Sequence, residues 1–173
     1  MNKKKIVLLI SIFWLIIIVG FIVIKEFTLR TGDGILLKTQ PIDPRDLFRG
    51  DYVILNYEIS TLDLRLLDID PTEFNINQRV FIKLDDQDGY GNPIGIYEKT
   101  PSDGLFMKGT IRNIQDSVIT IEYGIESYFV PEGMGMTIES QSGRNLDVMV
   151  KIDKFGNSII NSLLIDGKEI NLD

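Results

Sequence analysis

The sequence contains no cysteine and no histidine. The absence of cysteine excludes disulfides and thiol nucleophiles, and the absence of histidine excludes imidazole acid–base chemistry. Nearly every zinc or redox-metal site needs one of these two residues as a ligand. Any enzymatic activity would therefore depend on carboxylates, hydroxyls or lysines, and the sequence predicts no metal site and no bound cofactor.

Acidic residues are absent from the first 25 positions, and all 25 of them follow. Three of the 18 basic residues are Lys3, Lys4 and Lys5, so the chain after Lys5 has a net charge of −10. An acidic surface opposes the binding of nucleic-acid phosphates, so nucleic acid is not an expected partner. The charge suits a periplasmic or wall-facing domain, and it is equally explained by solubility alone.

A run of 19 uncharged residues extends from Ile6 to Ile24. As a helix it would be about 29 Å long, which matches the hydrocarbon thickness of a membrane. We therefore predict a membrane-spanning anchor that contacts lipid. The alternative is a cleaved signal peptide, but the run exceeds a usual signal h-region and no small-x-small cleavage pattern follows it.

The three lysines of the short leading tail place that tail in the cytoplasm by the positive-inside rule, although Lys25 and Arg30 oppose this bias. The sequence thus predicts a tail and anchor over residues 1–25, followed by one extracytoplasmic domain over residues 26–173. About 150 residues are enough to close a single hydrophobic core.

Beyond the anchor, short apolar segments alternate with Gly, Asp and Asn, and no long helical periodicity appears. We therefore expect a mainly β, mostly antiparallel domain with one or two short helices, near 62–67 and 132–141. The predicted strands cover residues 34–39, 51–58, 79–84, 94–98, 106–114, 118–123, 146–152, 158–166 and 168–172.

Two turns connect the last predicted strands. Asp166-Gly167 is typical of a tight hairpin turn, and residues 153–157 of a longer one, so the C-terminal strands should form an antiparallel meander. The acidic stretch 85–92 lacks the acid and the glutamate that an EF-hand needs at Leu84 and Gly95. It is better explained as a hairpin loop.

Residues 50–57 read Gly-Asp-Tyr-Val-Ile-Leu-Asn-Tyr. Gly50 can adopt a positive φ and turn the chain into a strand. Alternation then places Val53, Leu55, Tyr57 and Ile59 on one face, the expected core face, and Tyr52, Ile54, Asn56 and Glu58 on the other. The residues of this region that could bind a ligand are Asp51, Tyr52, Tyr57, Arg45 and Arg49.

The structural interpretation of the same residues is simpler. Asp51 would accept hydrogen bonds from turn amides or from a nearby arginine, and Tyr57 would pack in the core with its hydroxyl satisfied. Asp51 and Tyr57 lie about 20 Å apart along a strand, so they cannot form a catalytic pair by themselves.

The motif at 50–57 resembles the signature of the GDYXXLXY family of bacterial membrane-anchored proteins. The resemblance extends upstream through residues 41–49 and reappears at residues 123–133. It implies an anchored protein whose relatives accompany polytopic membrane proteins. The family has no assigned activity, so the resemblance implies no reaction.

The chain is also similar to type I signal peptidases, which place an anchor before a β body and carry a proline six residues before a Gly-Asp pair. Pro44 and Gly50 keep that spacing. The nucleophilic serine of that family lies three residues before the proline, where this chain has Pro41. Proline offers no nucleophile, so we expect no serine–lysine chemistry and no catalytic residues of that type.

Glu126 and Glu132 flank an aromatic segment at residues 128–131. Paired carboxyls can cleave a glycosidic bond when they face each other across a cleft. Aromatic residues such as Tyr128 and Phe129 could instead fill the core or, with Tyr52 and Tyr57, line a surface for an extended partner.

We therefore expect a membrane-anchored extracytoplasmic accessory or binding module that works beside a polytopic membrane protein. Tethering would raise the effective concentration and make a weak contact sufficient. The alternative is a carboxylate-based hydrolase of cell-envelope glycan that uses Asp51, Glu126 or Glu132. The sequence identifies no small-molecule ligand for either role.

Overall fold

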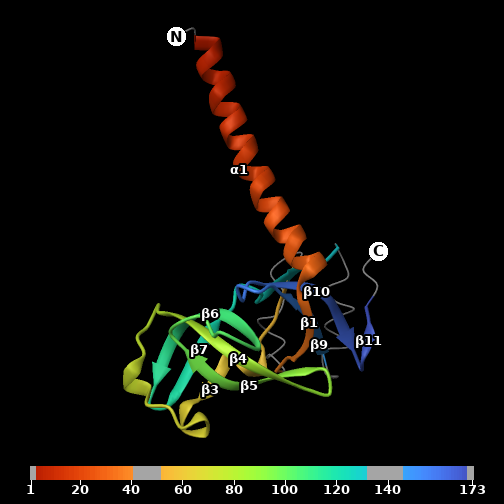
Figure 1. Cartoon of the computed structure of the whole chain (residues 1–173). Coiled ribbons are helices and arrows are strands. Elements are labelled where there is room, and N and C mark those ends of the chain that lie inside the picture. Colours follow the sequence, from red (N-terminus) through yellow and green to blue (C-terminus); the bar gives the residue numbers. More distant parts are fainter. Residues whose placement is uncertain (1–2, 41–51, 132–145, 171–173) are drawn as a thin grey trace.

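The computed structural model describes residues 3–40, 52–131 and 146–170. In these residues one long N-terminal helix stands on a β body (Figure 1). The predicted helix at 132–141 and the turn at Gly50 lie outside the described residues.

Helix α1 (Lys3–Thr31) contains the predicted apolar segment. Its large apolar side chains are exposed, and the body covers no part of its most apolar 18-residue window, which has a mean hydropathy of 3.3. At 1.5 Å per residue, 29 residues give a length of roughly 43 Å. Within the described ranges, α1 is the one helix long and apolar enough to cross a membrane.

The last turn of α1 is joined directly to the body. Thr28 is buried there, and its Oγ1 lies 3.1 Å from Oδ2 of Asp153 and 3.2 Å from the carbonyl oxygen of Ile24. Gly32 follows, where an added Cβ would lie 2.6 Å from the Thr28 carbonyl oxygen and 2.9 Å from that of Ile152. Only glycine permits this approach, and the first strand begins at the next residue.

Nine strands form one sheet in the order β11-β10-β9-β1-β5-β4-β6-β7-β3. The strands of this sheet are β1 (Asp33–Lys38), β3 (Thr61–Asp63), β4 (Arg79–Gln87), β5 (Tyr90–Tyr97), β6 (Leu105–Gln115), β7 (Val118–Glu122), β9 (Leu146–Ile152), β10 (Ser158–Ile165) and β11 (Lys168–Glu169). Leu36 of β1 pairs with Tyr90 of β5 in parallel, and the other pairs of the sheet are antiparallel. The sheet is therefore mixed, and the antiparallel expectation holds for all but this one pair.

A second, two-stranded sheet joins β2 (Tyr52–Ile54) to β8 (Ser127–Phe129). After β2 the chain forms an isolated bridge between Tyr57 and Thr39 and then the 3-10 turn η1 (Glu58–Ser60), which packs between β1 and β7. This crossing brings the end of β1 to the segment that leads into β3. As a result the main sheet curls around its buried face (Figure 1).

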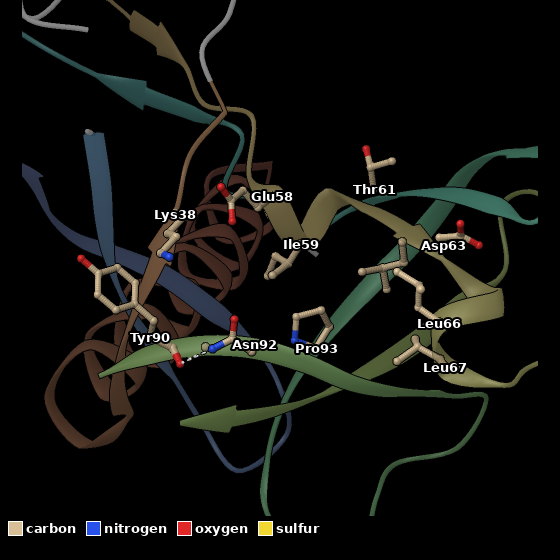
Figure 2. A pocket seen from close by; sticks show the side chains of 12 residues that line it. Lys38, Glu58, Ile59, Thr61, Asp63, Leu66, Leu67, Tyr90, Asn92 and Pro93 are labelled. Carbon is tan, nitrogen blue, oxygen red and sulfur yellow. Dashed lines mark hydrogen bonds between the residues drawn. The ribbon is translucent and has the colours of Figure 1, made fainter. Parts of the chain in front are cut away.

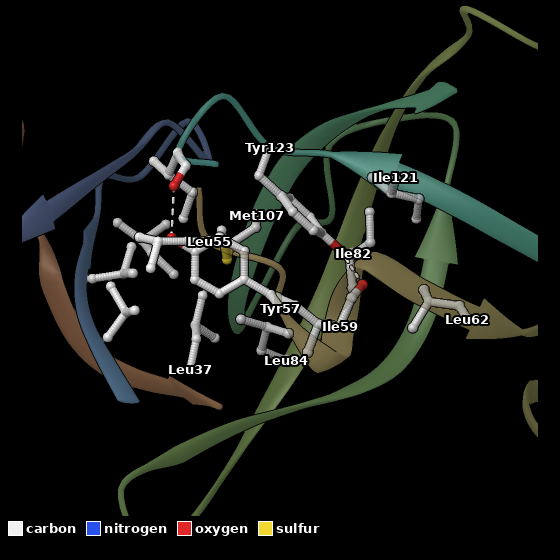
Figure 3. Packing of buried hydrophobic residues seen from close by; sticks show 14 of the residues in the cluster. Leu37, Leu55, Tyr57, Ile59, Leu62, Ile82, Leu84, Met107, Ile121 and Tyr123 are labelled. Carbon is white, nitrogen blue, oxygen red and sulfur yellow. Dashed lines mark hydrogen bonds between the residues drawn. The ribbon is translucent and has the colours of Figure 1, made fainter. Parts of the chain in front are cut away.

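The hydrophobic core fills the inside of this curl. The predicted core face is confirmed, because Val53, Leu55, Tyr57 and Ile59 are each at most 4% exposed. Their neighbours include side chains from several strands of the main sheet (Figure 3), among them Leu37, Ile82, Leu84, Met107, Ile121 and Tyr123. The segment that carries the sequence motif is thus the central packing element of the body.

Most predicted strands and turns are confirmed. The strand at 146–152 matches β9, and Asp166-Gly167 forms the predicted tight turn with φ values of 50° and 74°. Residues 153–157 connect β9 to β10 as predicted. The acidic stretch is a hairpin, whose turn is confined to Asp88-Gly89, with φ values of 55° and 87°.

Some predictions need correction. The strand predicted at 51–58 is shorter, because β2 ends at Ile54 and η1 begins at Glu58. The amide of Leu55 still donates to the Glu126 carbonyl at 2.8 Å. The helix predicted at 62–67 is β3 followed by the 3-10 turn η2 (Leu64–Leu67), which Asp63 caps by accepting from the amide of Arg65. Another 3-10 turn, η3 (Pro71–Glu73), and strands β3 and β8 were not predicted.

The junction between α1 and the body yields a prediction. Burial alone would raise the pKa of Asp153, but hydrogen bonds from Asn157, Phe155 and Thr28 outweigh it and hold the pKa below its ordinary value. We expect Asp153→Ala to lower the free energy of unfolding by about 1–3 kcal/mol, because it removes the acceptor of these donors.

The effect should depend on pH. Because the pKa is lowered by folding, the contribution of Asp153 is complete above its unfolded pKa of about 4 and is lost as the pH falls through the folded value. Denaturant unfolding from neutral to acidic pH measures this difference. Thr28→Val removes only the helix-side donor and should cost less than Asp153→Ala. An equal difference at every pH would contradict the assignment.

Candidate functional site

The predicted site residues do not gather at one described place. Arg45, Arg49, Asp51 and Glu132 lie outside the described residues. Tyr52 belongs to β2 and pairs with Phe129. Tyr57 and Glu126 are described completely, and both have structural partners.

Tyr57 and Tyr123 form a reciprocal clasp between two segments distant in the sequence (Figure 3). The Tyr57 hydroxyl donates to the Ile125 carbonyl at 2.6 Å, and the Tyr123 hydroxyl donates to the Ile59 carbonyl at 2.7 Å. Both rings are buried, at 0% and 8% exposed. Each tyrosine thus satisfies a carbonyl two residues beyond the other, and the prediction of a satisfied core hydroxyl at Tyr57 is confirmed.

Glu126 holds the turn that contains this clasp. Its Oε1 accepts from the amide of Tyr123 at 2.5 Å, and its Oε2 accepts from the amide of Gly124 at 2.8 Å. Burial, and then the charge of Glu126, raise the pKa of Tyr57 and of Tyr123 well above the usual value of a phenol. Both hydroxyls therefore stay protonated as donors, and both oxygens of Glu126 are engaged by backbone amides.

The remaining aromatics of the second motif block lie on the β2–β8 ribbon. Phe129 is 78% exposed, and Tyr128 is half-buried opposite Val53. The proposed aromatic surface is therefore reduced, because Tyr57 and Tyr123 are in the core. Successive side chains of β8 point to opposite faces, so Phe129 points away from the core.

A groove lies elsewhere, between β1 and β5 on one side and η1, β3 and η2 on the other (Figure 2). One compartment has a volume of about 260 Å³ and the next about 390 Å³. They share Lys38, Glu58 and Tyr90, so they form one continuous depression. We call it the amphipathic groove, since its two ends differ in polarity.

Apolar side chains line the first compartment. They come from η1, β3, η2 and β5, and they are Ile59, Leu62, Leu66, Leu67 and Pro93. Leu66 is 85% exposed, so most of its side chain is open to solvent at this compartment. Asp63 also lines this compartment, but its carboxylate forms an ion pair with Arg65. The hydrogen bond and the charge of Arg65 hold the pKa of Asp63 at about 2.

Charged side chains line the second compartment. Lys38 on β1 is the register partner of Asp147 on β9, so both side chains project on the same face. The Tyr90 hydroxyl donates to Asp147 at 2.7 Å, and the Lys38 ammonium lies 5.1 Å from the centroid of the Tyr90 ring. The hydrogen bond to Asp147 raises the pKa of Tyr90. Glu58 lies across the groove from these residues (Figure 2).

The sequence reasoning did not find this groove. Its polar residues come from four segments between positions 38 and 147, and no local pattern connects them. One signal was present in the sequence, because Asp147 is an acid within an apolar strand. In the structure its side chain is only 6% exposed, and a buried carboxylate requires a partner. Among the described residues, no three acidic side chains converge in a way that could hold a metal ion.

The clasp predicts a stability effect. Tyr57→Phe and Tyr123→Phe should each lower the free energy of unfolding by about 1–3 kcal/mol, because each leaves a buried carbonyl without its donor. Tyr97→Phe, at a residue 44% exposed, serves as the matched control and should be nearly neutral. Chemical denaturation of the three variants and of the double variant measures the coupling. Losses no larger than that of the control would contradict the clasp.

The raised pKa values predict alkaline destabilisation. In the unfolded chain both phenols ionise above about pH 10, whereas in the folded chain they stay protonated. Stability from these groups is therefore complete below pH 10 and falls as the pH rises further. The free energies of unfolding of the wild type and of the double Tyr57→Phe, Tyr123→Phe variant, plotted against pH, should converge in alkaline solution. Parallel curves would refute the prediction.

Comparison with known proteins agrees with the sequence motif. The model of a family described as GDYXXLXY protein matches residues 14–163, which include the second half of α1, the motif at 50–57 and most of the body. No curated protein and no solved structure matches the chain. Since the family model covers most of the chain, this protein belongs to the GDYXXLXY family.

Proposed function

We propose that this protein is a membrane-anchored binding module whose amphipathic groove accepts a segment of a partner. The observation that carries the proposal is the groove itself, which places the exposed Leu66 and the half-buried Leu67 and Pro93 beside charged side chains. By contrast, internal hydrogen bonds already engage the polar groups of Tyr57, Tyr123 and Glu126 in the motif regions. Recognition therefore has its best support in the groove, outside the signature motif.

The charge of the groove favours a basic partner. Its polar end is lined by two carboxylates, Glu58 and Asp147, and one ammonium, Lys38, which lies over the Tyr90 ring. The net charge of this end is therefore negative, and the net charge of the whole chain is also negative, at −7. We infer a segment that carries lysine or arginine next to an apolar side chain, the latter filling the compartment beside Leu66.

The predicted anchor indicates where in the cell this module would act. With α1 across the membrane and the lysines of the leading tail inside, the body would lie outside the cytoplasm. A partner in the same membrane, such as a polytopic protein with a basic extracytoplasmic loop, would be met at a high effective concentration. A modest groove then suffices for occupancy.

Crosslinking in native membranes tests this proposal. With a photoreactive residue at Thr61 on the rim of the groove, the wild type should give a specific adduct. Glu58→Lys and Leu66→Asp should each reduce its yield about tenfold, which corresponds to 1.4 kcal/mol. The matched controls are Glu73→Lys and Ile76→Asp, which make the same changes at exposed residues outside the groove. Equal yields in the variants and the controls would contradict a binding groove.

A second candidate is a carboxylate-based hydrolase of cell-envelope glycan. Glu126 is engaged by backbone amides, but Glu58 and Asp147 line one compartment of about 390 Å³. Two carboxyls about 5–10 Å apart across a cleft are what such chemistry requires. Incubation of the protein with purified envelope glycan distinguishes the candidates: a hydrolase releases soluble fragments and loses this activity in Glu58→Gln, whereas a binding module releases none.

A further inference from the structure

The direct connection between α1 and the body fixes how close the body comes to the membrane. The apolar run ends at Ile24, and Thr28, one turn later, is already buried against Asp153. Four residues of helix advance about 6 Å along the axis. The headgroup layer on each side of a bilayer is about 5–8 Å thick. With α1 inserted, the top of the body therefore reaches the headgroup layer.

Described parts of the body near the base of α1 carry exposed aromatic residues. Phe155, 59% exposed, lies in the β9–β10 turn two residues after Asp153. Phe129, 78% exposed, lies on β8 and lines a cleft of about 310 Å³ together with Lys25 of α1. In Figure 1 the teal segment that contains β8 ends beside the base of the helix. Phe27 of α1 itself is 55% exposed at the same level.

Basic side chains accompany these aromatic residues. Lys25 and Lys154 are exposed there, and the Lys154 ammonium lies 5.1 Å from the centroid of the Phe155 ring. Two described acids of the same segments have internal partners, since Glu26 pairs with Arg30 and Asp153 accepts from its own turn and from Thr28. Aromatic rings next to basic groups suit the membrane interface, where the rings enter the boundary and the cations meet phosphate.

We propose that a juxtamembrane rim, formed by Lys25, Phe27, Phe129, Lys154 and Phe155, rests in the lipid headgroup layer. The contact adds to the anchor and fixes the tilt of the body on the membrane. The groove-lining turn η2 lies at the opposite end of the body from α1 (Figure 1). Lipid contact at the rim thus directs the amphipathic groove away from the membrane surface.

Fluorescence quenching of the full chain in nanodiscs tests this proposal. Trp14 is the one tryptophan, so Trp14→Phe gives a silent background for Phe129→Trp and Phe155→Trp. In discs whose lipids carry a nitroxide on the headgroup, both variants should lose most of their emission relative to label-free discs. Leu66→Trp, in the groove, is the control and should keep its emission. Quenching of the rim variants no stronger than that of the control would overturn the proposal.

Two further measurements separate lipid contact from other causes. The wild-type Trp14, near the middle of the anchor, should be quenched by lipids labelled deep in the acyl chain, which establishes insertion independently of the rim. In discs containing anionic lipid, Lys154→Glu in the Phe155→Trp background should weaken headgroup quenching. Lys99→Glu, the same charge change at an exposed residue outside the rim, should leave it unchanged. Equal effects of the two lysine variants would overturn the role of the rim charges.

Discussion

The reciprocal hydrogen bonds of Tyr57 and Tyr123 are the constraint on which the rest of the body depends. Of the crossing from β1 to η1, the described residues 52–60 pair with β8 over three residues and with Thr39 at an isolated bridge, and these two buried phenols join them to the turn between β7 and β8. Desolvated hydrogen bonds of this kind are costly to leave unmade. They set the position of η1, and η1 in turn forms one wall of the amphipathic groove.

Much of the fold follows from local pattern, and the groove does not. Strict alternation at Val53, Leu55 and Tyr57 predicts their burial, and Asp-Gly pairs predict turns, because both signals act within a few residues. Strands β3 and β8 have three residues each, too few for a period to be recognised. The role of Asp147 depends on Tyr90, which only the folded chain brings near, so sequence reasoning overlooked it. Glu126 accepts from the amides of Tyr123 and Gly124 in its own turn, a local arrangement that sequence reasoning assigned instead to a possible catalytic pair.

The signature motif therefore has a different meaning from that of an active-site motif. Its described residues build the core and lead into η1, while the side chains that line the groove lie outside the motif. A family defined by such a motif shares a scaffold. If the groove is a binding site, as proposed, members can differ in what they recognise through changes at Lys38, Glu58, Leu66 or Tyr90 without disturbing the clasp.

The tight fit at Gly32 has a mechanical consequence. A flexible linker would let a tethered domain search a hemisphere around its anchor, and its local concentration would be diluted over that volume. Here only Gly32 separates the end of α1 at Thr31 from the start of β1 at Asp33, so the domain cannot move far from its helix. With α1 in a membrane, as proposed, its remaining freedom is rotation about the helix axis and lateral diffusion with the anchor. Partners that diffuse alongside it in that membrane would then be favoured.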